Sequence, residues 1–159
     1  APGIYQISIT GTFPRIYNYN NVDRAKIVSW DNLGDVGFST NQIFAFHYCR
    51  NLISIPSDHI EFWTTLVNGL NMFRLCGFTS LPEGMSLDSL TSGNDMFFGS
   101  TINTTDYSNL LIRMEANNPN TGVVFNGGSS KYNAAGETAR NALLARVPAW
   151  TITDGGLEV

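Results

Sequence analysis

A chain of 159 residues is long enough for one domain with a sizeable core. Charged residues make up only 14% of it, against roughly 25% in an ordinary soluble domain, and the net charge is -4. With nine basic residues and no dense cationic stripe, nucleic acid is an unlikely class of partner on charge alone. No apolar run reaches the roughly 18 residues that cross a bilayer, and the first residues lack a signal-peptide pattern, so we expect no membrane span and no anchor.

The first 42 residues have the alternation of β-strands. "IYQISIT" places Tyr5, Ile7 and Ile9 on one face of an extended chain, and the other face carries Ile4, Gln6, Ser8 and Thr10. "RIYNY" follows after a break at Gly11 and Pro14, and "AKIVSW" can supply a third strand. This pattern predicts an N-terminal β cap over residues 1–42.

One phrase recurs from residue 43 onward. "AFHYCRNLISIP" (45–56) is answered by "MFRLCGFTSLP" (72–82), which places Phe73 and Cys76 27 residues after Phe46 and Cys49. "MFFGS" (96–100) follows 24 residues later, with serine in the place of cysteine. Such a period predicts stacked solenoid turns over residues 43–119. The strands would be "LISIP" and "FTSLP", and the side chains expected to point inward are Leu52, Ile55, Phe78 and Leu81.

The pattern changes after residue 119. "TGVVFNGGSSKYN" predicts a strand and a glycine-rich turn, "AAGETARNALLARV" predicts a helix that ends before Pro148, and "WTITD" predicts a last short strand. Residues 120–159 would then form a C-terminal strand-helix-strand cap. The predicted fold class is a single-domain α/β solenoid, a short leucine-rich-repeat stack of about three turns with a cap at each end.

The phrase "MFRLCGFTSLPEGMSLDSLTSGNDMF" resembles the repeat of the BspA-like bacterial surface leucine-rich repeat proteins, a unit of about 26 residues. The flanking phrases "ITGTFPRIYNYN" and "ARNALLARVPAWTITDGG" are similar to the segments that enclose such repeats in short versions, many of them encoded by bacteriophages. The resemblance implies a protein that acts by presenting a surface, and it implies no catalytic residues.

Nothing in the sequence has the spacing of a catalytic or metal site. His47, Cys49, His59 and Cys76 lack the paired spacing of structural zinc sites, and equivalent corners of neighbouring turns explain the two cysteines as core residues. We therefore expect no metal, no cofactor and no disulfide. No nucleophile motif occurs. The acids that could be paired for glycoside hydrolysis lie in turn-like contexts, where aspartate is ordinarily a cap: Asp31, Asp35, Asp58 and Asp88.

The aromatic residues offer a candidate binding surface. Some of them fall off the inward positions of the recurring phrase, and exposed tyrosine and tryptophan are the usual anchors of protein or sugar contacts. The candidate binding residues are Tyr17, Tyr19, Tyr48, Phe62, Trp63 and Tyr107.

These features predict a non-enzymatic binding or assembly module. The leading interpretation is a bacteriophage virion protein on the particle surface, either a capsid decoration or head fibre or a tail fibre that serves host attachment. Its partners would be other virion subunits or a host-surface protein or glycan, and it could self-associate, for example as a trimer. The alternatives are an extracellular or cell-surface BspA-like adhesin and, less favoured, a carbohydrate-active enzyme.

Overall fold

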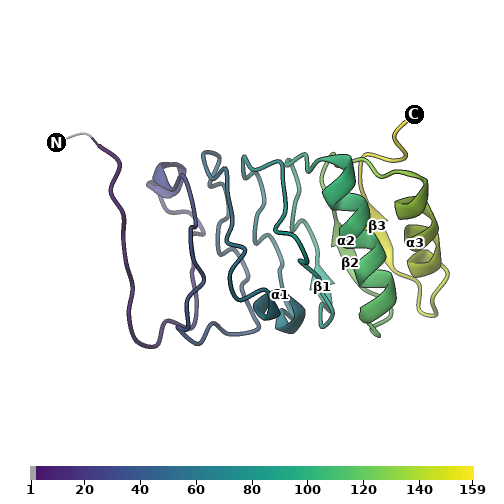
Figure 1. Ribbon diagram of the computed structural model, residues 1–159, viewed down its shortest axis with the longest axis horizontal. Helices are drawn as coiled ribbons and strands as arrows, with labels where there is room; N and C mark the ends of the chain where they lie inside the picture. The colour runs from purple at the N-terminus through teal and green to yellow at the C-terminus, as the bar shows by residue number, and fades with distance from the viewer. Residues whose placement is uncertain (1–2) are drawn as a thin grey trace.

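The computed structural model describes residues 3–159, and its elements follow one another along a long axis (Figure 1). The N-terminal segment lies at one end of the molecule, and the two longer helices lie at the other (Figure 1). The helices and strands are η1 (Arg24–Lys26), α1 (Glu61–Thr65), β1 (Ser92–Gly93), α2 (Thr104–Asn117), β2 (Val124–Asn126), α3 (Ala134–Leu144) and β3 (Thr151–Thr153). None of the described helices is long and apolar enough to span a membrane.

The sheet has three parallel strands in the order β1-β2-β3, and the register places Gly93 opposite Phe125 and Phe125 opposite Ile152. Parallel neighbours need a crossover connection, and α2 and α3 provide the two crossovers. The two helices pack against each other beside the sheet (Figure 1). The strand, helix and strand expected after residue 119 are therefore present as β2, α3 and β3.

The predicted α/β solenoid of leucine-rich repeats is wrong: the structure is a small α/β fold with three α-helices and one open three-stranded parallel sheet. The N-terminal β cap is also absent, because the described residues before 43 contain the short helix η1 and no strand. "LISIP" and "FTSLP" form no strand either. Their side chains Leu52 and Phe78 are nevertheless buried, and Ile55 and Leu81 are partly buried against the core.

Backbone geometry explains why the recurring phrase forms turns. Phe44, Tyr48 and Leu75 have φ angles of 59°, 62° and 58°, in the left-handed region that an extended strand does not use. Between these positions, amides donate to the carbonyl three residues earlier, as Cys49 does to Phe46 (3.0 Å). Alternate amides donate across to the following segment, as Phe46 does to Met72 (2.8 Å). About half of the backbone amides in the recurring phrase thus close local turns, and the others join neighbouring segments.

The recurring phenylalanines meet in the core. Phe73 is stacked between Phe46 (ring centroids 5.7 Å apart) and Phe97 (5.8 Å), with interplanar angles of 9° in both pairs. All three are buried in one hydrophobic cluster that extends along the chain from Leu33 to Ile152. The spacings of 27 and 24 residues therefore bring equivalent aromatic rings into contact.

Both cysteines are free and buried. Cys76 Sγ donates to the carbonyl of Phe46 (3.1 Å), and in the next segment Ser100 Oγ donates to the carbonyl of Cys76 (3.0 Å). Burial raises the pKa of the Cys49 thiol to about 11 and raises that of Cys76 further. Both cysteines therefore remain thiols. The side chains of Cys76 and Ser100 each donate a hydrogen bond to the backbone of the preceding segment.

Candidate functional site

Two of the candidate tyrosines face outward because the residue between them is held inward. The backbone amide of Asn18 donates to the carbonyl of Phe44 (3.1 Å), and its buried side-chain Nδ2 donates to that of Ala45 (2.7 Å). Side chains alternate along an extended segment, so Tyr17 and Tyr19 point to solvent. They are 54% and 53% exposed.

A second segment adds its rings to the same surface. The Tyr19 ring lies 4.7 Å from that of Phe44 and 5.6 Å from that of His47, and Tyr17 meets Phe44 edge-on at 6.2 Å. The Tyr48 ring lies 4.5 Å from His47. We call the group Tyr17, Tyr19, Phe44, His47 and Tyr48 the tyrosine face. It brings together three of the six candidate residues from two separate stretches of the chain.

Three arginines lie on these rings. The guanidinium carbon of Arg15 lies 4.8 Å from the Tyr17 ring centroid, and those of Arg24 and Arg50 lie 4.6 Å and 5.5 Å from that of Tyr48. Cation–π contacts of this kind hold a guanidinium in place while its donors stay available. Among the described residues, none of these arginines forms a salt bridge. The tyrosine face therefore carries local positive charge on a chain of net charge -4.

His47 lies at the centre of the tyrosine face and is only 8% exposed. Its Nδ1 is buried and has no hydrogen-bond partner among the residues that the structure describes. Burial lowers the pKa of His47 below its ordinary value of 6.5, and the neighbouring charges of Arg24 and Arg74 lower the pKa further. The imidazole is therefore neutral at pH 7 and packs as one more ring of the cluster.

The remaining three candidate residues lie in the core, so they are not part of an exposed surface. Phe62 and Trp63 belong to α1 and pack with Trp30, while Tyr107 of α2 is completely buried. The Tyr107 hydroxyl donates to Asp154 Oδ2 (3.1 Å). These three residues belong to helices α1 and α2, which the recurring phrase does not describe.

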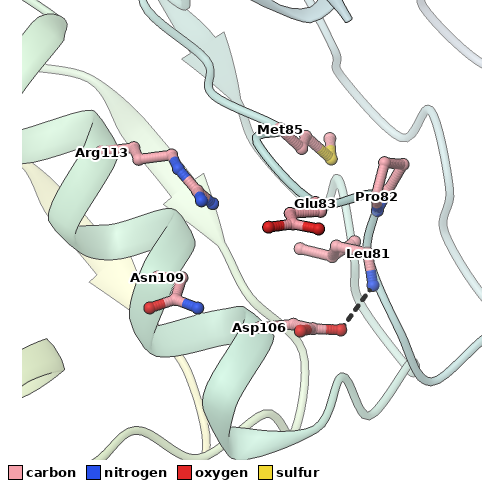
Figure 2. Close-up of a pocket in the computed structure, with 7 residues that line it drawn as sticks. All are labelled: Leu81, Pro82, Glu83, Met85, Asp106, Asn109 and Arg113. Carbon is pink, nitrogen blue, oxygen red and sulfur yellow. Dashed lines mark hydrogen bonds between the residues drawn. The ribbon is translucent and has the colours of Figure 1, made fainter. Parts of the chain in front are cut away.

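A polar pocket of about 280 Å³ lies between α2 and the segment around Pro82 (Figure 2). Glu83 and Asp106 are its carboxylates, and Arg113 reaches it from α2. Asp106 Oδ2 accepts from the backbone amide of Leu81 (2.9 Å) and from Asn103 Nδ2 (2.7 Å). Asp106 is therefore a helix-capping residue, and the pocket does not offer the two free carboxylates of a glycoside hydrolase. Sequence reasoning did not find this pocket.

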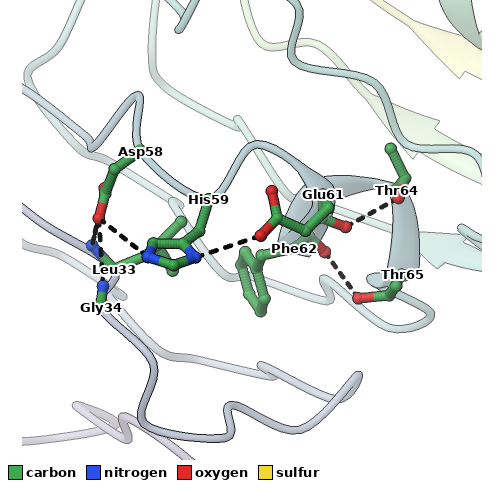
Figure 3. A network of polar contacts seen from close by, with 8 residues as sticks. All are labelled: Leu33, Gly34, Asp58, His59, Glu61, Phe62, Thr64 and Thr65. Carbon is green, nitrogen blue, oxygen red and sulfur yellow. Dashed lines mark hydrogen bonds and ion pairs between the residues drawn. The ribbon is translucent and has the colours of Figure 1, made fainter.

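A smaller pocket of about 180 Å³ contains His59 and Glu61, whose Nδ1 and Oε1 lie 3.1 Å apart (Figure 3). Asp58 beside them accepts hydrogen bonds from the backbone amides of Leu33 (2.9 Å) and Gly34 (3.2 Å). These bonds join Asp58 to a segment 24 to 25 residues earlier, whereas the sequence predicted a cap in its local turn. The nearby hydroxyls of Thr64 and Thr65 donate to backbone carbonyls. Figure 3 therefore shows a structural network without an activated nucleophile.

No group of three histidine, cysteine, aspartate or glutamate side chains is arranged to hold a metal ion within residues 3–159. Comparison with family models, curated proteins and solved structures finds no match for the chain. The resemblance to BspA-like proteins therefore remains a prediction from the recurring phrase.

The environment of His47 gives a prediction about acid stability. Because the folded state holds the imidazole neutral, the unfolded chain binds more protons as the pH approaches 6.5 from above. The contribution of His47 to the free energy of unfolding is therefore present above pH 6.5 and is lost as the pH falls through its lowered pKa. Urea unfolding of wild type and His47→Phe from about pH 7.5 to about pH 5 should show a smaller loss in the variant. The exposed His59→Gln is the control, and an equal loss in His47→Phe and wild type would contradict the assignment.

Proposed function

We propose that this chain is a non-enzymatic binding and assembly module that engages its partner through the tyrosine face. The observation that carries the proposal is the gathering of Tyr17, Tyr19 and Tyr48 on one surface with three arginines free of acidic partners. Tyrosine and arginine are the residue types that dominate binding energy at interfaces. Rings already fixed by Asn18 and by mutual packing lose little conformational entropy when a partner docks.

The charge of the face indicates the nature of the partner. Three guanidiniums without a salt bridge favour a surface that carries carboxylate, sulfate or phosphate groups, on a host-surface protein or glycan. The rings would supply apolar contact area, and the arginines would orient the acidic groups. Binding should therefore weaken as salt concentration rises.

We propose a bacteriophage virion as the setting, with the chain as a capsid decoration, head fibre or tail fibre component. The support is the resemblance of the recurring phrase to the BspA-like repeat, together with the similarity of the flanking segments to those of short versions, many of them encoded by bacteriophages. Quantitative mass spectrometry of purified particles should find the chain at a fixed ratio to the major capsid protein. Recovery from cell envelopes, with none in the particles, would overturn this setting in favour of a cell-surface adhesin.

Substitution of the face tests the binding proposal. Tyr17→Ala combined with Tyr48→Ala should weaken binding to host-envelope preparations by at least about 30-fold, since the loss of one anchor residue alone costs about 2 kcal/mol. Biolayer interferometry at low and at raised salt measures the loss. Ile112→Ala, an exposed apolar truncation on α2, is the matched control and should bind as wild type does. Unchanged binding by a folded double variant would refute a role for the tyrosine face.

A further inference from the structure

The N-terminal arm, residues 3–12, is extended and lies at the end of the molecule opposite α3 (Figure 1). Within the described chain, no backbone hydrogen bond joins residues 6–12 to another segment, and such bonding begins with the amide of Phe13, which donates to Val36 (2.8 Å). Ile4, Ile7 and Ile9 are 90%, 83% and 48% exposed. Residues 6–12 thus present backbone groups without a partner segment, and the arm carries apolar side chains at Ile4, Ile7 and Ile9.

The composition of the arm suits pairing with an identical strand. Ile7 and Ile9 lie on one face, and Gln6, Ser8 and Thr10 lie on the other. A two-fold pair places the residues near the axis beside their own copies, so a charged residue there would face a like charge. Residues 3–14 contain no lysine, arginine, aspartate or glutamate, so these stretches of two arms meet without repulsion. None of the devices that blunt an exposed edge strand, such as an edge lysine, is present in residues 6–12.

The opposite end of the molecule is closed to a docking strand. Arg140 of α3 donates to the carbonyl of Ile152 in β3 (3.1 Å), and the C-terminal segment pairs with Tyr132 through Gly156 (3.1 Å) and Glu158 (2.8 Å). Head-to-tail addition of one copy to the next therefore meets a covered edge. An arm can therefore pair with the exposed arm of a second copy, but not with the covered edge at the other end of that copy.

We propose that two copies of this chain pair antiparallel through their N-terminal arms around a two-fold axis. A two-fold axis brings the same edge of two identical strands together, and this contact closes on itself without forming a filament. The pair uses a different surface from the tyrosine face, so either inference can fail without the other.

A two-stranded ribbon alone is only marginally stable, so the arms must also cover apolar side chains at the open end of the body. In the segments that follow the arm, Ile16 and Ile27 are partly buried against the core, and Val28 is 38% exposed. The interface is small, and we expect a dissociation constant of about 1–100 µM.

Sedimentation velocity of the full chain from about 1 µM to about 200 µM should show a monomer that converts to a dimer. Ile7→Asp should remain monomeric over this range, because it places two carboxylates at the two-fold contact. The control Ile53→Asp, at a 68% exposed position outside the arm, should dimerise as wild type does. A monomer at every concentration, a trimer, or a dimer unaffected by Ile7→Asp would overturn the proposal.

Cross-linking provides a second readout that does not depend on affinity. Cys49 and Cys76 are buried thiols, so an introduced surface cysteine is the reactive one. Ser8→Cys should form a disulfide-linked dimer under mild oxidation, and Thr121→Cys, at an exposed position just before β2, should not. Equal cross-linking of the two variants would count against arm pairing.

Discussion

Phe73→Ala is expected to lower the free energy of unfolding by about 3–5 kcal/mol, the cost of truncating a fully buried phenylalanine. The ring is stacked on both sides, by Phe46 and Phe97, and Phe78 meets it edge-on at 5.2 Å with an interplanar angle of 89°. Trp63 is the fourth aromatic neighbour, with its ring centroid 6.1 Å away. Removal of the Phe73 ring leaves a cavity in the core, and these four rigid rings cannot easily move to fill it. Urea denaturation monitored by circular dichroism measures the loss.

Phe98→Ala is the matched control for this prediction. It is the same truncation, but the Phe98 side chain is 41% exposed, and its main contact is with the Arg74 guanidinium, 4.0 Å from the ring centroid. Loss of a cation–π contact at such a site is expected to cost about 0.5–1 kcal/mol. Equal losses in Phe73→Ala and Phe98→Ala would show that the stack of phenylalanines does not hold the core together.

Asp154→Ala is expected to cost about 3–5 kcal/mol, as for other buried ion pairs that lose one partner. The Asp154 side chain is 2% exposed, and its Oδ2 accepts from Arg140 Nε (2.8 Å) and from the Tyr107 hydroxyl (3.1 Å). The substitution removes this acceptor from both donors. The Arg140 side chain is only 18% exposed, and the Tyr107 hydroxyl is buried. Since these groups join α2, α3 and the end of β3, the loss should appear as one cooperative decrease in thermal stability.

The exposed ion pair between Asp23 and Lys26 provides the control. Its atoms are 2.6 Å apart, but the two side chains are 60% and 79% exposed. Asp23→Ala should therefore change the free energy of unfolding by less than about 1 kcal/mol. A similar loss in Asp23→Ala and Asp154→Ala would mean that burial does not decide the strength of these pairs.

Local patterns in the sequence predicted several elements and much of the core. β2, α3 and β3 follow from short apolar runs, a helical periodicity and the glycine and proline residues between them. The recurrence of Phe44, Phe46, Phe73 and Phe97 predicts buried rings. Phe46, Phe73 and Phe97 are buried, whereas Phe44 is only half-buried and lies on the tyrosine face. These elements and buried rings depend mainly on residues close in the chain, so the sequence pattern is sufficient to predict them.

Helix α2 also has a sequence signal, which the search for a recurring phrase obscured. Asn103 and Asp106 form reciprocal hydrogen bonds at its start, and Tyr107, Leu110 and Met114 follow at helical spacing. The assignment of residues 43–119 to stacked turns overrode this local pattern. The same assignment predicted strands where left-handed residues such as Phe44 and Tyr48 make the backbone turn.

The sequence by itself determined which residues are apolar, uncharged or spaced for burial, because these are properties of the chain and its local periodicity. The tertiary structure alone decided which aromatic residues reach solvent. Tyr17 and Tyr19 are exposed because Asn18 is hydrogen-bonded to a segment about 26 residues away, whereas Trp63 and Tyr107 are covered by elements distant in sequence. Exposure is set by long-range packing, so the tyrosine face became visible only in the folded chain.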